Sequence, residues 1–219
     1  MTRKSQVAVI GLGNIGAAIV TNLTKGKRSV IVADRTIEKA NQLSQRLGSL
    51  VQPATIADAI KQADIVVLAI YFDPIKEFFK TYATELQGKI IVDPSNPIAP
   101  DENGGFKKII GVDESAGQIL STLLPYEAKL AKALGTLGAE SLASASFQTP
   151  EKAVEFYATD DSSINNKIEE LIRDNGFEPL RIGGLNQSIR LEVFGDLHQF
   201  GALGKTVTLA EAKNIINNI

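Results

Sequence analysis

The 219-residue sequence contains no cysteine and no tryptophan, and its only histidine is His198. Without cysteine there is no disulfide, no thiolate metal ligand and no cysteine nucleophile. A single histidine also argues against a zinc or iron site built from several imidazoles. The lack of cysteine fits a reducing compartment, and we expect a cytoplasmic protein.

Long apolar runs and an excess of positive charge are missing as well. Only four apolar residues, Val7–Ile10, stand between the basic N-terminus and the first glycine, which is too few for the core of a secretory signal peptide. No stretch approaches the roughly 20 apolar residues that cross a bilayer. The formal net charge of −2 provides no basic surface for nucleic acid or for an anionic membrane. We therefore expect neither as a partner.

What the sequence does contain, up to Val92, is an alternation of short apolar runs with amphipathic segments. We predict strands at 6–10, 29–33, 50–52, 64–70 and 89–92, and helices at 15–24, 37–47, 56–62 and from Pro74 to about Leu86. Strands that are apolar along their whole length are typical of a parallel sheet covered on both faces. The fold class predicted here is α/β, with a doubly wound, Rossmann-type parallel sheet.

The pattern changes after Val92, where three prolines fall within residues 93–100. Beyond that point we predict helices at 115–123, 164–175, 187–198 and 209–216, and strands at 131–134, 153–158 and 179–182. We place a boundary near Gly135, so that residues 1–135 form a dinucleotide-binding domain and residues 136–219 a small C-terminal α/β domain. The last two helices are apolar enough to supply a homodimer interface.

A glycine motif, G-x-G-x-x-G, joins the first predicted strand to the first helix at Gly11, Gly13 and Gly16. In such a loop the first glycine permits a tight turn, the second lets a pyrophosphate approach the backbone, and the third lets helix and strand pack closely. The helix N-terminus then offers unpaired N–H groups to the phosphates. This context predicts a bound dinucleotide rather than a purely structural turn.

Asp34 closes the second strand, 18 residues beyond Gly16. A carboxylate at this position accepts hydrogen bonds from the ribose hydroxyls and repels a 2′-phosphate, which favours NAD(H). Arg35 follows at once and Lys39 comes one helical turn later, and these cations favour NADP(H). The residues alone leave both cofactors open.

The order of motifs along the chain resembles that of one known family. The motifs are GLGNIGAAIV, VADRTIEKA, ADIVVLAIYFDPIKEFF, LQGKIIVDPSNPIAP, AKALGTLGAESLA and LIRDNGFEPLRIGGLNQSIRLEVFGDLH. Together they resemble the reduced coenzyme F420:NADP oxidoreductases, a family whose fold also forms the reductase domain of STEAP-type metalloreductases. The resemblance implies NADP(H) along the strand ends and hydride transfer to a planar redox acceptor.

The resemblance also implies roles for particular residues. The pyrophosphate would be lined by Gly11, Leu12, Gly13, Asn14 and Ile15. Arg35 would hold the 2′-phosphate, beside Asp34 where the family commonly has serine. Ala69 and Ile70 would touch the adenosine side, and Asn96 and Pro97 would lie near the nicotinamide. One departure stands out, because Gly135 replaces the asparagine that the family has facing the nicotinamide or acceptor.

The leading hypothesis is hydride transfer between a nicotinamide and a flavin-like or deazaflavin (F420) ring, which mainly requires that the two rings be positioned. A dehydrogenase or imine reductase of small substrates is the second hypothesis. An alcohol dehydrogenase would need a proton donor or acceptor near the substrate oxygen, and His198 is the candidate, although a packed structural role is the commoner one for such a residue. A dinucleotide-binding sensor without turnover is the third reading. Tyr71 and Phe72, after the fourth strand, could stack on a ring or simply pack.

Overall fold

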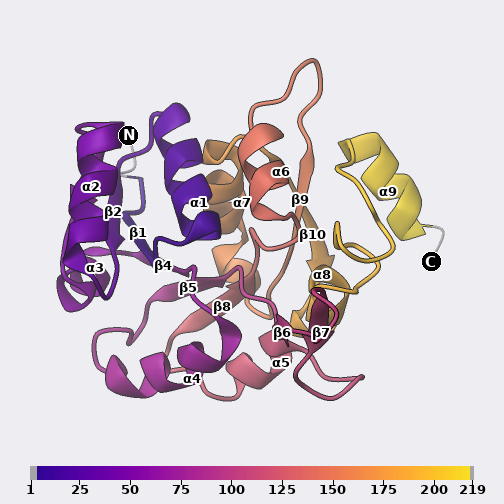
Figure 1. The fold of residues 1–219 in the computed structure, drawn as a ribbon, viewed down its shortest axis with the longest axis horizontal. Coiled ribbons are helices and arrows are strands. Elements are labelled where there is room, and N and C mark those ends of the chain that lie inside the picture. Colours follow the sequence, from indigo (N-terminus) through magenta and orange to yellow (C-terminus); the bar gives the residue numbers. More distant parts are fainter. Residues whose placement is uncertain (1–3, 218–219) are drawn as a thin grey trace.

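The computed structural model describes residues 4–217, which form one eight-stranded sheet covered by helices on both faces (Figure 1). The strand order is β10-β9-β8-β5-β4-β1-β2-β3. The strands of this sheet are β1 (Val7–Ile10), β2 (Val30–Ala33), β3 (Val51–Pro53), β4 (Ile65–Leu68), β5 (Ile90–Asp93), β8 (Lys129–Lys132), β9 (Val154–Ala158) and β10 (Glu178–Gly183). All pairs are parallel except β8 with β9, which meet at the single pair Lys132–Ala158. The predicted doubly wound α/β fold is confirmed.

The helices are α1 (Asn14–Lys25), α2 (Ile37–Leu47), α3 (Ile56–Gln62), α4 (Phe72–Thr81), α5 (Ala116–Ser121), α6 (Ala139–Ser144), α7 (Asn165–Asp174), α8 (Ser188–Leu191) and α9 (Leu209–Asn217). In Figure 1, α1, α6 and α7 lie above the sheet and α4 and α5 lie below it. A separate hairpin pairs β6 (Ile98–Pro100) with β7 (Phe106–Lys108). Neither this hairpin nor α6 was expected from the sequence.

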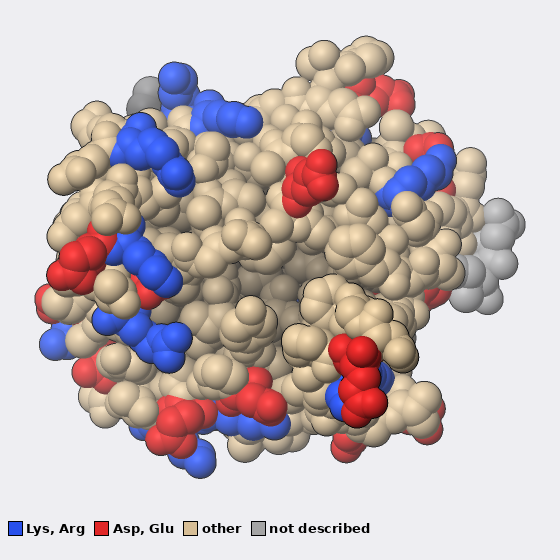
Figure 2. All heavy atoms as spheres, viewed as in Figure 1, with Lys and Arg blue, Asp and Glu red and all other residues tan. Residues whose placement is uncertain are grey.

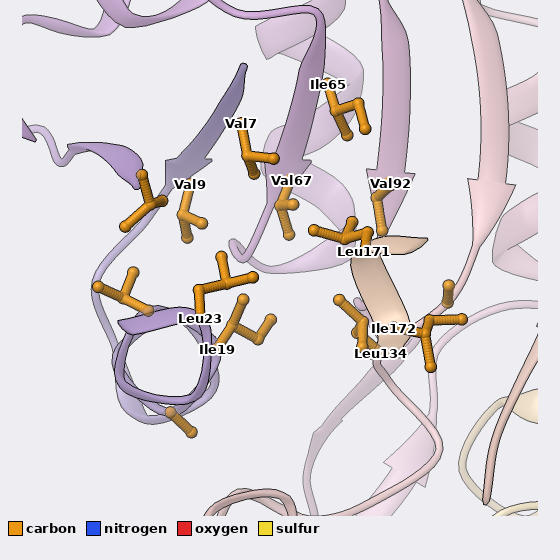
Figure 3. Close-up of a cluster of buried hydrophobic side chains, with 14 of the residues drawn as sticks. Val7, Val9, Ile19, Leu23, Ile65, Val67, Val92, Leu134, Leu171 and Ile172 are labelled. Atoms are coloured by element: carbon orange, nitrogen blue, oxygen red, sulfur yellow. The ribbon is translucent and has the colours of Figure 1, made fainter. Parts of the chain in front are cut away.

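Alternate residues of the central strands β1, β2, β4 and β5 enter two different cores, as expected for a sheet buried on both faces. On one face, Val7 and Val9 of β1 pack with Ile19 and Leu23 of α1 and with the apolar face of α7 (Figure 3). On the other face, Ala8 and Ile10 pack with α3, α4 and α5. The uninterrupted apolar strands therefore reflect two-sided burial.

The first core extends across the boundary predicted near Gly135. It includes Leu134 and Leu137 beyond β8, and Ile168, Leu171 and Ile172 of α7. Leu134, Leu171 and Ile172 are labelled in Figure 3. A third core joins β9 to α8 and α9. In α9, Leu209, Ile215 and Ile216 pack against this third core, so much of the helix's apolar face is used within the chain itself.

Two predicted helices differ from the structure. Helix α4 begins at Phe72, so Pro74 is its third residue, and it ends at Thr81 rather than near Leu86. Proline is tolerated there because the first-turn N–H groups of a helix have no intrahelical partner. The helix predicted over 187–198 is wrong beyond Leu191, since Glu192 leaves the helix in an extended conformation. Among the described residues, no helix is both long and apolar enough to cross a membrane.

Candidate functional site

The glycine loop lies at the carboxyl ends of β1 and β4. Gly11 has φ +91°, and a Cβ placed there would lie 2.5 Å from the Ala69 carbonyl oxygen and 2.6 Å from Ile70 Cγ2. Its N–H donates to the Ala33 carbonyl at 2.9 Å. Ala69 and Ile70, which the resemblance implies on the adenosine and ribose side, thus lie directly behind the turn.

Gly13 and Gly16 have different surroundings. A Cβ on Gly16 would come within 1.9 Å of the Gly11 carbonyl oxygen, so this glycine is required for α1 to approach β1. A Cβ on Gly13 would meet nothing within 4 Å. Gly13 and Asn14 are exposed, and Leu12 and Ile15 are half-buried. Open space in front of bare backbone is what the predicted pyrophosphate contact needs.

The first turn of α1 has no side-chain cap and no acidic residue. The first four N–H groups of a helix lack intrahelical partners, and the helix dipole adds positive potential at this end. A dinucleotide pyrophosphate would fit this end of the 12-residue helix, where the backbone of Gly13, Asn14 and Ile15 would face it.

The Asp34 carboxylate is turned toward the protein backbone. Its Oδ2 accepts the Leu12 N–H at 2.9 Å and its Oδ1 accepts the Thr36 N–H at 3.1 Å. The side chain is 12% exposed, and Lys39 Nζ lies 3.9 Å from Oδ1. Asp34 therefore shapes the glycine loop whichever cofactor is bound.

Two cations lie at this end of the site, beside the acidic Asp34 and Glu38. Arg35 and Lys39 are both exposed, at the start of α2. In Figure 2, Lys and Arg side chains lie on the left of the face shown with Asp and Glu side chains beside them, whereas the hollow at its centre is lined by uncharged residues. This distribution suits a ligand with a phosphorylated end and an uncharged planar end.

Asn96 and Pro97 follow β5, at the same edge of the sheet. Pro97 is buried. The Asn96 amide bridges two segments, because Oδ1 accepts the Val193 N–H at 2.7 Å and Nδ2 donates to the Gly135 carbonyl at 3.3 Å. The structure thus brings Asn96 together with the loop after β8 and with the C-terminal segment.

Gly135 packs directly against the backbone after β5. A Cβ at this position would lie 2.4 Å from the Pro94 carbonyl oxygen. The preceding Leu134 has φ +60°, in the left-handed region that non-glycine residues rarely adopt. In this loop packing, a side chain at position 135 would collide with the main chain after β5.

His198 is buried, and both of its ring nitrogens are engaged. Nδ1 accepts the Phe200 N–H at 2.9 Å, and Nε2 donates to the Gly135 carbonyl at 3.0 Å. Burial lowers the pKa of His198 to about 4, with a smaller contribution from the Lys132 charge. This neutral imidazole fixes the Gly135 loop and has no nitrogen free for proton transfer.

A buried charged network lies under the ends of β5 and β8. Lys132 Nζ donates to Asp93 Oδ2 at 2.8 Å and to the Ser95 carbonyl, and it lies 3.9 Å from Glu192 Oε1. The Glu192 carboxylate also accepts the N–H groups of Ala116 and Gly117, at 3.0 and 3.1 Å. Desolvation raises the pKa of Glu192, and the Lys132 charge and the N–H groups of Ala116 and Gly117 oppose this rise.

Glu155 is a second buried carboxyl group near this loop. Its Oε2 accepts the Thr136 hydroxyl at 2.7 Å, while Oε1 is buried without a hydrogen-bond partner. Burial raises the pKa of Glu155 to about 8, so the group is mostly neutral at pH 7. The sequence offered no signal for this residue, which stands among apolar neighbours on β9.

Tyr71 and Phe72, the two candidates for stacking on a ring, differ in burial. Phe72, the first residue of α4, is 1% exposed and packs in the second core. Tyr71 beside it is 81% exposed. The crevice between Asp93, Lys132 and Gly135 is too narrow to admit a water molecule. Within residues 4–217, no group of histidine and acidic residues could hold a metal ion.

Comparison with known proteins supports the resemblance seen in the motifs. Residues 6–97 match the family model described as NADP oxidoreductase, coenzyme F420-dependent. A pyrroline-5-carboxylate reductase from Mycobacterium tuberculosis is 30% identical over 173 residues, which cover 72% of this chain and 52% of that protein. The chain thus spans about half the length of this relative.

Solved structures share the fold over nearly the whole chain. The hypothetical protein SMa0349 from Sinorhizobium meliloti is 28% identical with a TM-score of 0.80, over 93% of this chain and 95% of that one. A protein of Arthrobacter sp. FB24, proposed to be an F420-dependent NADP reductase, is 22% identical with a TM-score of 0.71, over 84% and 86% of the two chains. The Rossmann-like architecture is therefore shared, and residues 6–97 carry the family match.

Proposed function

We propose that this relative of the F420-dependent NADP oxidoreductases uses NADPH and delivers its hydride to a flavin-like or deazaflavin ring. The observation that carries the proposal is the uncapped first turn of α1 behind the open backbone of Gly13. Bound there, the dinucleotide supplies the hydride. The protein's own task is to hold two planar rings in contact and to exclude competing reactions.

The preference for NADPH is supported by the charges at the ribose end. Both oxygens of Asp34 already accept backbone N–H groups, while Arg35 and Lys39 remain exposed for a 2′-phosphate. A guanidinium and an ammonium together outweigh one carboxylate that is partly satisfied by the backbone.

The choice of a planar acceptor is supported by the state of two side chains near the Gly135 loop, His198 and Lys132. Reduction of a carbonyl needs a proton donor at the substrate oxygen. His198 has both nitrogens engaged, and Lys132 is 2% exposed and held by Asp93 and the Ser95 carbonyl. A flavin-like ring does not need a protein acid in the hydride step.

A second candidate is reduction of a C=N bond in a small substrate. The similarity to pyrroline-5-carboxylate reductase over 72% of this chain favours it. An iminium carbon accepts hydride directly, so this reaction also places little demand on a protein acid.

The test is a pair of calorimetric titrations with NADPH and NADH, followed by assays of nicotinamide absorbance with three acceptors. We expect NADPH to bind at least about tenfold more tightly, equivalent to roughly 1.4 kcal/mol. Oxidation with riboflavin or 8-hydroxy-5-deazariboflavin supports the planar acceptor. Oxidation only with 1-pyrroline-5-carboxylate supports the second candidate, and tight NADPH binding without any oxidation supports a sensor. Tighter binding of NADH would show that Asp34 governs the ribose site.

A further inference from the structure

Phe194 is exposed at the end of an otherwise buried segment. Its three predecessors, Leu191, Glu192 and Val193, are at most 8% exposed, whereas Phe194 is 54% exposed. Its φ is +77°, in the left-handed region. Such a conformation costs a bulky L-residue about 1–2 kcal/mol. Neither the exposure of the ring nor the backbone conformation helps the chain to fold.

The turn that carries Phe194 is held rigidly. Main-chain groups are fixed by three hydrogen bonds: Val193 N–H to Asn96 Oδ1 at 2.7 Å, Gly195 N–H to Glu192 O at 2.7 Å, and Leu197 N–H to Arg190 O at 2.9 Å. A Cβ on Gly195 would lie 2.4 Å from the Arg190 carbonyl oxygen, so the turn closes tightly behind the phenylalanine. The ring is therefore presented in a defined place and does not belong to a loose loop.

The place is the ligand edge of the sheet. The Asn96 contact ties the turn to the loop after β5, and the same amide reaches Gly135 after β8. Phe106, which is also 54% exposed, lies instead on the separate hairpin and has no positive φ. A single exposed apolar side chain is common on protein surfaces. The combination of exposure, strain and position is what distinguishes Phe194.

We propose that Phe194 is the stacking platform for the planar acceptor ring, an inference that rests on the proposed function. An aromatic side chain stacks on any flat heteroaromatic ring with little need for hydrogen-bond readout, and its two side-chain torsions limit the entropy lost on binding. Asn96 and Glu192 are then positioning residues, because they hold the turn and do not contact the acceptor.

The experiment measures binding of riboflavin and of 8-hydroxy-5-deazariboflavin, by quenching of their fluorescence, in the presence of saturating NADP⁺. The variants are Phe194→Ala, Phe194→Trp and, as the matched control, Phe106→Ala. We expect Phe194→Ala to weaken binding of the tighter ring about tenfold or more, within the range for loss of one stacking partner. Phe194→Trp and Phe106→Ala should bind it as the unchanged chain does. NADPH affinity, measured by calorimetry, should be unaffected in all three.

Two outcomes overturn the platform while leaving the proposed function intact. One is that the unchanged chain binds and reduces a planar ring and Phe194→Ala does so equally well. The other is that Phe194→Ala loses NADPH affinity to the same extent, which would show that Phe194 supports the cofactor site or the fold rather than the acceptor ring. If the unchanged chain binds NADPH but neither ring, the planar acceptor itself is wrong and the platform is wrong with it.

Discussion

Gly13 and Gly16 belong to one motif but have opposite surroundings. The space in front of Gly13 is open, whereas a Cβ on Gly16 would overlap the Gly11 carbonyl oxygen. We predict that Gly13→Ala keeps or slightly raises the free energy of unfolding, since the φ of Gly13 is −72°. The same variant should weaken NADPH binding at least about tenfold, because the methyl group occupies the approach to the backbone.

Gly16→Ala should lower the free energy of unfolding by about 2–3 kcal/mol. Urea unfolding and calorimetry separate the two effects, and equal loss of stability in both variants would contradict the assignment.

The buried carboxyl of Glu155 makes stability depend on pH. Its folded pKa of about 8 exceeds the ordinary value of 4.5, so the folded state binds the proton more tightly. The contribution of Glu155 to stability is therefore complete below about pH 4.5, declines as pH rises and is lost above about pH 8. We predict that the free energy of unfolding of the unchanged chain falls by an amount on the order of a few kcal/mol between these pH values. In Glu155→Gln this fall should be absent. Urea unfolding at a series of pH values measures it.

The exposed Glu151 provides the control for this prediction. Glu151→Gln should leave the pH profile of stability unchanged. A Glu155→Gln profile that follows the unchanged chain would mean that Glu155 stays ionised through contacts other than those described.

At the scale of elements, the turn after α1 is tied to the end of α7 by one buried cation. Arg28 is 4% exposed, and its guanidinium lies 2.8 Å from Asp174 and donates to the Ser5 carbonyl. Removing one partner of a buried ion pair leaves the other charge poorly compensated. We predict that Arg28→Met lowers the free energy of unfolding by about 3 kcal/mol.

The exposed pair of Lys80 with Glu77, at 3.4 Å on α4, provides the comparison. Lys80→Met should change the free energy of unfolding by no more than about 0.5 kcal/mol, because exposed pairs contribute little. Urea unfolding measures the free energy of unfolding of both variants. Similar losses in Arg28→Met and Lys80→Met would show that the Arg28 contact is no stronger than a surface pair.

The elements themselves were predictable where the signal is local. The helix at 37–47 and the helix at 56–62 capped by Thr55 agree with the structure, because apolar spacing and a capping side chain act within one turn. The helix expected over 187–198 fails after Leu191 for a non-local reason. There Glu192 turns away to accept N–H groups at the start of α5.

At the scale of the whole molecule, one sheet and one core run across residue 135. The first core contains side chains from β1 and α1 as well as from α7, far along the chain. Segments that share a core generally unfold together. We predict a single urea transition with coincident midpoints by far-UV circular dichroism and by tyrosine fluorescence. Two separate transitions would instead support independent domains at 1–135 and 136–219.

The sequence by itself determined the sheet type and the strand–glycine–helix loop, and with them the expectation of a dinucleotide, because apolar periodicity and glycine spacing are properties of neighbouring residues. Only the tertiary structure decided what the polar side chains at the sheet edge do. Asn96 meets Val193 across 97 positions, His198 meets Gly135 across 63, and Glu192 meets Ala116 across 76. Contacts between residues so far apart depend on how the strands and loops pack, so His198 and Asn96 could be singled out beforehand but their partners could not.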